Sequence, residues 1–329
     1  MPAAADARTL FTLVRKSIDA RAIGIHVRKP FRFLLCGDPA LVAELRALLL
    51  SGHDDGVPPE AAACLETIRA DAPLVTNPAE IRAVIFLGRP GDAAAADFAA
   101  LSTLRVPILA VTVNPAGEPS APQAPPIPGA WSEYVVPSIT RDALRGRLFP
   151  HVVEVAHGVE IAVGRNLPVL RDTVAAKLTR DAANNALKVA LASAVVDHIP
   201  LVGIVLGAFA SAGDMVAITG IQVMLMLHIE AAYGRDPDLQ RTWQLLPVIG
   251  GGFGWRALAR ELAGFVPVAG IAIKGAIAYA GTVVVGEGVT FFHEQGRYMT
   301  AGQASSLYEH AKNDALRFAR ELVGKLRKQ

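Results

Sequence analysis

The sequence predicts two parts of different fold class: an N-terminal open α/β domain with a mostly parallel sheet, and a C-terminal all-α module rich in glycine and alanine. Short apolar runs alternate with helical stretches over residues 31–138, which is the order of βαβ units. Residues 199–292 consist of two long apolar blocks joined by a charged turn. We therefore expect an amphipathic helix in 1–24, the α/β domain in 25–150 and the helical module in 151–329.

The expected strands of the α/β domain are almost continuously apolar, as in a parallel sheet that is buried on both faces. They lie at 31–37, 72–76, 81–88, 106–114 and 134–138. Helices are expected between them at 40–52 and 92–104, and the proline-rich segment 116–131 is expected to be a loop. The helix predicted within 1–24 has one apolar face with basic residues around it. It therefore docks on the next domain or lies on a membrane surface.

The second half of the chain is expected to be helical throughout. Thr140 is a suitable N-cap for a helix over 139–165, and a longer helix is expected over 167–198. The pattern apolar-Pro-apolar-x-Gly occurs twice, at Pro200 and at Pro267. Each proline is expected to open a glycine-rich apolar helix. Apolar residues at three- and four-residue spacing predict a last amphipathic helix over 301–329.

The composition is unusually apolar for a protein of this length. Of the 329 residues, 52% are hydrophobic and 19% are charged, which indicates a membrane or a very apolar helical core. The net charge of +2 gives no field that would recruit nucleic acid, so no nucleic-acid partner is expected. Cys36 and Cys64 lack metal-ligand spacing and are expected to be buried reduced thiols, and no metal site is predicted.

The turn after the first strand lies where a P-loop would bind phosphate, but the residues differ. Gly37 is followed by Asp38 and a proline, without the lysine and hydroxyl residue that neutralise phosphate and hold magnesium. Asn114 follows a later strand where a guanine-reading motif would begin, and Ser138 follows the last strand. These four residues are interpreted as vestigial positions of a nucleotide site. No catalytic residue and no cofactor are predicted.

Two features of the apolar blocks are predicted to be structural. Asp214 and Lys274 each interrupt an apolar block near its middle, and we expect them to form an ion pair. A glycine run resembles a dinucleotide fingerprint, but no convincing strand precedes it, so close helix packing at a hinge is the preferred interpretation. The run consists of Gly250, Gly251, Gly252 and Gly254.

The two apolar blocks, over roughly residues 190–296, resemble a domain of unknown function that occurs in YcjF-like inner-membrane proteins and after Era-like GTPase domains. The resemblance is carried by short pieces along both blocks: Pro200 with Asp214, Ile221-Gln222, Tyr233-Gly234, Gly252-Phe253-Gly254 with Arg256, Pro267 with Gly270, and Tyr279-Ala280 leading to Gly286. It implies a helical, membrane-associated module without assigned catalytic residues. By its order in the chain, the N-terminal part then resembles the GTPase domain that precedes such a module. Because its nucleotide motifs differ, the resemblance implies a degenerate GTPase-like domain.

These observations favour a non-catalytic, GTPase-related scaffold or anchor at the cytoplasmic face of the inner membrane. Membrane lipid or a membrane protein is the expected partner, and a homo-oligomer is a further expectation. The alternatives are an atypical nucleotide-dependent GTPase switch, which would be an enzyme, and a soluble cytoplasmic helical protein that serves interaction or oligomerisation. Spanning helices, re-entrant hairpins and a packed bundle all remain open at this point.

Overall fold

A computed structural model of the chain shows two compact units. It describes residues 12, 20–70, 77–90, 95–115, 132–196, 203–240, 242 and 270–326. The α/β unit comprises the described residues of Gly24–Lys177 and Ala232–Gly234, and the helical unit comprises those of Met1–Ile23, Leu178–Ala231 and Arg235–Gln329. The sequence placed the boundary at residue 150, whereas this division falls after Lys177.

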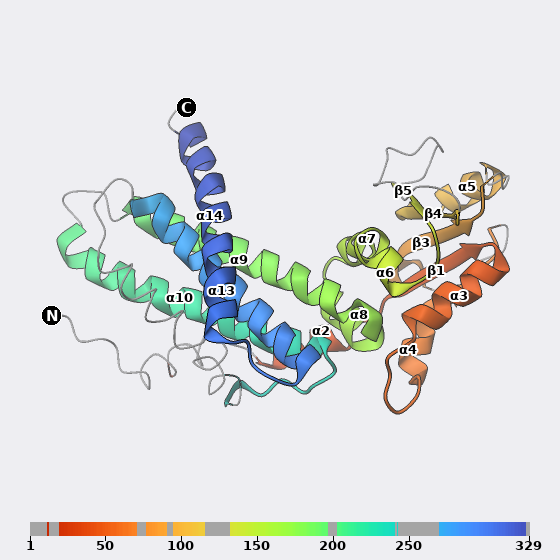
Figure 1. Ribbon diagram of the computed structural model, residues 1–329, viewed down its shortest axis with the longest axis horizontal. Coiled ribbons are helices and arrows are strands. Elements are labelled where there is room, and N and C mark those ends of the chain that lie inside the picture. Colours follow the sequence, from red (N-terminus) through yellow and green to blue (C-terminus); the bar gives the residue numbers. More distant parts are fainter. Residues whose placement is uncertain are drawn as a thin grey trace. The chain divides into compact units, whose positions relative to one another are not determined.

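The α/β unit contains a five-stranded, entirely parallel sheet in the order β2-β1-β3-β4-β5 (Figure 1). The strands are β1 (Arg32–Gly37), β2 (Leu65–Thr67), β3 (Ile81–Gly88), β4 (Ile108–Val113) and β5 (Ser132–Val136). The order changes direction at β1, so β2 and β3 lie on either side of the first strand. The predicted class, an open parallel α/β fold followed by an all-α part, is confirmed.

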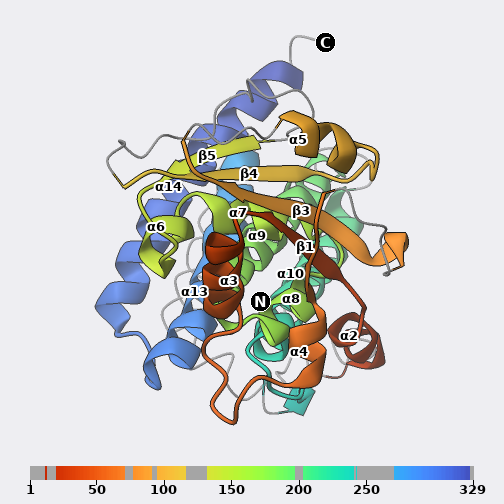
Figure 2. The ribbon, with the colours of Figure 1, turned by 90° about the vertical axis from the view of Figure 1, so that its right-hand side faces the viewer.

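Helices cover both faces of the sheet, as the continuous apolar runs predicted. Helix α5 (Ala95–Ser102) lies on one face, and α3 (Pro39–Leu49), α6 (Arg141–Arg145) and α7 (Leu148–Val155) lie on the other (Figure 2). Phe98 and Leu101 of α5 pack against alternate residues of three strands, among them Leu34, Val84 and Phe86. The residues between these, which point to the opposite face, are buried as well.

Several short elements complete the α/β unit. They are α4 (Pro59–Ala63), α8 (Glu160–Asn166), the two short 3-10 helices η1 (Pro78–Glu80) and η2 (Pro168–Leu170), and the part of α2 (Ala20–Val27) from Gly24 onward. Strand β2 was not predicted, and the strand expected at 72–76 lies outside the described residues. Cys36 and Cys64 are buried and are not joined in a disulfide, as expected.

The single helix expected over 139–165 is wrong, because this segment forms α6, α7 and α8. Thr140 does cap α6, since its hydroxyl accepts a hydrogen bond of 3.4 Å from the Ala143 amide. A turn at Gly146 ends α6, and a turn that contains Gly158, with a φ of 79°, separates α7 from α8. A residue in this left-handed region does not continue a helix, which is the physical reason for the break.

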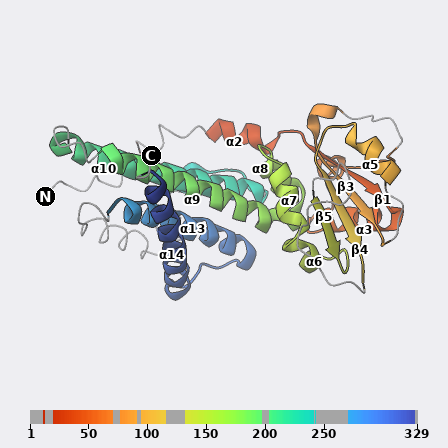
Figure 3. The same ribbon diagram turned by 90° about the horizontal axis from the view of Figure 1, so that it is seen from above.

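The helical unit is built from α10 (Gly203–Ala232), α13 (Gly270–Gln295), α14 (Ala301–Leu326) and the later part of α9 (Arg171–Val196). Helices α9, α10 and α13 run beside one another, and α14 crosses them and packs against α13 (Figures 1 and 3). Ala186 of α9 and Ala278 of α13 meet Ile218 and Ile221 of α10 in one cluster. Small residues at this contact let the three backbones approach closely.

Glycines on α13 bring that helix against α9. A Cβ added to Gly286 would overlap the buried Thr179 side chain, and one added to Gly275 would come within 2.6 Å of the Leu187 side chain. The two glycines are eleven residues apart, or three helical turns, so they lie on one face of α13. Close packing at glycine is thus observed at this face of α13, whereas the glycine run for which it was predicted lies outside the described residues.

Candidate functional site

The four predicted nucleotide-site positions lie at one edge of the sheet. Gly37 ends β1, Asn114 directly follows β4, and Ser138 comes two residues after β5. Because all strands are parallel, these residues share the carboxyl edge, where open α/β sheets bind ligands at the point where the strand order reverses. Gly37 and Asp38 lie at that point, between β1 and β3.

Gly37 is required by the backbone at this position. Its φ is 112°, in the region that favours glycine, and a Cβ would overlap the carbonyl of Leu87 on β3. The Asp38 amide donates a hydrogen bond of 2.8 Å to the same carbonyl. The turn that follows β1 is therefore packed directly against β3, with no room for a side chain at Gly37.

Asp38 occupies the N-terminus of α3, where a P-loop would hold phosphate. Its Oδ1 accepts hydrogen bonds from the amides of Ala40 at 2.8 Å and Leu41 at 3.1 Å. Its Oδ2 lies 3.0 Å from Nε of Arg89, which follows β3. The Leu41 amide and the Arg89 guanidinium hold the pKa of the Asp38 carboxyl below its usual value. The carboxylate thus takes both the helix N-terminus and the nearby cation that an incoming anion would need.

The other two positions form local contacts. The backbone amide of Asn114 donates a hydrogen bond of 2.8 Å to the Val136 carbonyl, which continues the pairing of β4 with β5. The Ser138 hydroxyl lies 3.3 Å from the hydroxyl of Thr140, the N-cap of α6. Across the described residues, no group of three or more His, Cys, Asp or Glu is placed to hold a metal ion.

A cavity of about 670 Å³ lies at the opposite, amino edge of the same sheet. Arg32 opens β1, Cys64 precedes β2 and Glu80 precedes β3, and all three line the cavity. The walls also include the chain after α2, the end of α8 and the first residue of α9. The lining contains five arginines or lysines and two glutamates; the cations are Arg28, Lys29, Arg32, Arg165 and Arg171.

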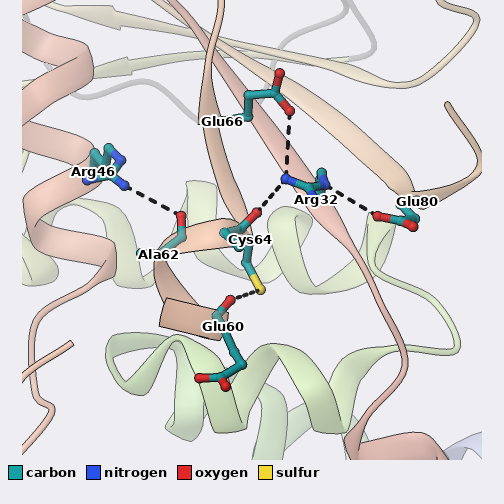
Figure 4. A network of polar contacts seen from close by, with 8 residues as sticks. Arg32, Arg46, Glu60, Ala62, Cys64, Glu66 and Glu80 are labelled. Carbon is teal, nitrogen blue, oxygen red and sulfur yellow. Dashed lines mark hydrogen bonds and ion pairs between the residues drawn. The ribbon is translucent and has the colours of Figure 1, made fainter. Parts of the chain in front are cut away.

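Arg32 is the one lining cation held by two carboxylates in the network of Figure 4. Its guanidinium lies 3.3 Å from Glu80 and 3.9 Å from Glu66, and it donates a 2.9 Å hydrogen bond to the Ala63 carbonyl. The Cys64 thiol donates to the Glu60 carbonyl at 3.2 Å, and burial raises the pKa of this thiol to about 11. Arg32 therefore fixes the strand ends at this edge, and Cys64 is a poor nucleophile.

Arg171, like Arg165, is partly buried, whereas Arg28 and Lys29 are exposed. The Nε of Arg171 donates a 3.3 Å hydrogen bond to the Gly164 carbonyl, and its guanidinium lies 5.9 Å from the centre of the Tyr233 ring. Burial lowers the pKa of this guanidinium and the neighbouring Arg165 lowers it further, whereas Tyr233 and Asp54 act in the opposite direction. Burial is thus the main cause of the lowered pKa, and the repulsion from Arg165 is a smaller one.

The predicted structural residues of the helical unit are placed only in part. Asp214 lies in α10 and Lys274 in α13, but their side chains are outside the described part of the structure, so their ion pair stays a prediction. Pro200, Pro267 and the glycine run are also outside it; the run is Gly250, Gly251, Gly252 and Gly254.

Comparison of the chain with protein-family models, curated proteins and solved structures finds no match. The resemblance of the apolar blocks to the domain of YcjF-like and Era-like proteins accordingly stays a prediction. The cavity at the amino edge was missed by sequence reasoning, because its lining residues are spread from Val27 to Gly234 and form no local motif. The one local signal was the basic pair Arg28-Lys29 just before the first strand.

Proposed function

We propose that the chain is a non-catalytic, GTPase-related scaffold that holds its α/β unit at the cytoplasmic face of the inner membrane through its helical unit. The observation that carries the non-catalytic part is the pairing of Asp38 with the α3 N-terminus and with Arg89. A phosphate at this edge would meet a carboxylate in the position that it would itself occupy. The Lys and Ser or Thr that would hold nucleotide and magnesium are absent from the turn after Gly37.

The membrane part of the proposal is supported by α13. Within the described residues, one helix, Gly275–Gln295, is long and apolar enough to cross a membrane. Its most apolar window is 72% buried against the rest of the protein, which favours the alternative of a helical interaction protein whose core helix is α13. A re-entrant or interfacial arrangement of the bundle fits both observations. Membrane lipid or a membrane protein is the proposed partner.

Nucleotide binding is tested by calorimetry of the full chain with GTP and Mg²⁺. We expect no binding at micromolar concentration, because the α3 amides and Arg89 already bind Asp38. The control is Arg89→Gln, which removes the cation of this edge and should give the same result as the wild type. Saturable, Mg²⁺-dependent binding of GTP that Arg89→Gln weakens would contradict the scaffold proposal and favour a nucleotide-dependent switch.

Membrane association is tested by fractionating cells that express the chain and washing the membranes with alkaline carbonate. We expect the chain to stay in the membrane pellet. Release into the wash would indicate a peripheral protein, and recovery in the supernatant before the wash would favour the interaction protein. Gel filtration with light scattering of the purified chain then measures the proposed homo-oligomer.

A further inference from the structure

We propose that the cavity at the amino edge of the sheet binds a small molecule that carries phosphate. The ligand is a phosphate monoester or pyrophosphate group, either on a soluble molecule or on a lipid headgroup. This inference concerns the α/β unit alone and does not depend on the proposed anchoring through the helical unit.

The charges that line the cavity favour an anion. Glu80 is already bound to Arg32 at 3.3 Å, so this pair contributes little net charge. Lys29 donates to the Gly158 carbonyl at 3.1 Å, and Arg171 donates to the Gly164 carbonyl at 3.3 Å. A carbonyl accepts the hydrogen bond but carries no charge, so both cations keep their positive field. Arg28 and Arg165 add further positive charge to the lining, whereas Glu60 in the lining and Asp54, which acts on Arg171, add negative charge.

The arrangement of Arg165 and Arg171 points to a ligand between or beside them. Both side chains are partly buried, and each raises the positive potential at the other. Repulsion between the two guanidinium groups costs free energy in a partly desolvated site; Tyr233 and Asp54 offset part of this cost at Arg171, and a bound anion lowers it further. Planar guanidinium forks match phosphate oxygens in geometry, which favours phosphate over a single-point anion.

The size of the cavity and its other lining residues further limit the kind of ligand that it can bind. A volume of about 670 Å³ lies in the range of small-molecule sites, so the cavity admits a ligand larger than a single phosphate ion. His53, also in the lining, lies with Nε2 3.1 Å from the Asn166 carbonyl and is a further polar side chain at the site. Phe31 and Pro30 provide apolar surface beside the cations for the rest of the ligand.

The test is calorimetric titration of the full chain with inorganic pyrophosphate. We expect saturable binding that Arg165→Gln and Arg171→Gln each weaken by about tenfold, as for the loss of one charge-assisted hydrogen bond. Arg28→Gln is the variant whose folding is not in question, because Arg28 is exposed, and it should weaken binding as well. The matched control is Arg89→Gln, which removes the same charge at the opposite edge and should leave binding unchanged.

Vesicles separate the two sources of the phosphate group. The full chain is sedimented with vesicles of phosphatidylcholine, with and without phosphatidic acid. Extra binding to phosphatidic acid that Arg165→Gln removes assigns the cavity to a lipid headgroup, and pyrophosphate binding without such extra binding assigns it to a soluble molecule. If the chain binds both kinds of vesicle equally and Arg165→Gln does not alter this binding, the binding is assigned to the helical unit and supports the proposed anchoring. The cavity proposal is overturned if neither probe binds, or if Arg89→Gln weakens pyrophosphate binding while the three cavity variants do not.

Discussion

The close approach of α13 to α9 can be tested by the same substitution at glycines with opposite surroundings. Gly220, inside α10, has no heavy atom within 4 Å of an added Cβ, whereas Gly286 on α13 has the Thr179 side chain in that space. Alanine is favoured over glycine inside a helix by about 1 kcal/mol. Gly220→Ala should therefore raise the free energy of unfolding by about that amount.

At Gly286 the same gain is opposed by steric overlap. Thr179 is 3% exposed, so its side chain has no solvent to turn into, and α9 or α13 must move. Overpacking of this kind costs about 1–3 kcal/mol, which leaves Gly286→Ala less stable than the wild type by up to about 2 kcal/mol. Gly275→Ala should fall between the two, because it meets the flexible end of Leu187.

Scanning calorimetry of the full-length variants measures the difference, and hydrogen exchange assigns the transition to α13. A difference of about 2 kcal/mol separates Gly220→Ala from Gly286→Ala by about 4–8 °C in Tm for a unit of this size. Adding Thr179→Ala to Gly286→Ala should recover part of the loss, because the overlapping hydroxyl and methyl groups are removed. If the Tm of Gly286→Ala equals that of Gly220→Ala and is no lower than the Tm of the wild type, α13 and α9 do not approach each other as described.

Three further changes test the remaining expectations. Asp214→Ala or Lys274→Ala alone should cost about 3–5 kcal/mol of unfolding free energy, and the double apolar replacement should recover much of it; additive losses in a double-mutant cycle would show that the two do not meet. Gly252→Leu should lower the melting temperature if the glycine run packs helices, and an unchanged melt with lost ligand binding would instead indicate a phosphate cradle. Burial raises the pKa of Cys64 from 9.0 to about 11, so the unfolded chain ionises first as pH rises. Stability should then fall between about pH 9 and 11 relative to Cys64→Ala, and parallel denaturation midpoints in the two proteins over this range would contradict the assignment.

The strands that were predicted correctly share one property. β1, β3 and β4 are runs of apolar residues with no polar alternation, because both faces of the sheet are covered, and such runs are visible in a single sequence. β2 has three residues, of which Leu65 alone is buried, so it carries too little pattern to be recognised. The helix over 139–165 was predicted from its start at Thr140, and the turns at Gly146 and Gly158, which divide the segment into three helices, were not predicted.

The candidate sites differ in how far the sequence could predict them. Gly37 and Asp38 follow a strand that is recognisable from its residues, so their position at the carboxyl edge could be predicted. The bond from Asp38 to Arg89 could not, because it joins residues 51 apart through the pairing of β1 with β3. The amino-edge cavity depends on the same pairing together with the packing of α8 and α9, neither of which leaves a pattern in the chain.

The two edges of the sheet have opposite electrostatic character, and this decides where a ligand would bind. At the carboxyl edge the cation Arg89 and the α3 amides are bound to one carboxylate, so an incoming phosphate must displace Asp38 and gains little. At the amino edge Lys29 and Arg171 donate to uncharged carbonyls, so a phosphate adds a charge interaction with each of them. Open α/β sheets bind ligands at the carboxyl edge because backbone amides point there. In this chain Asp38 takes those amides, and the arginines and lysine that favour an anion lie at the other end of the strands.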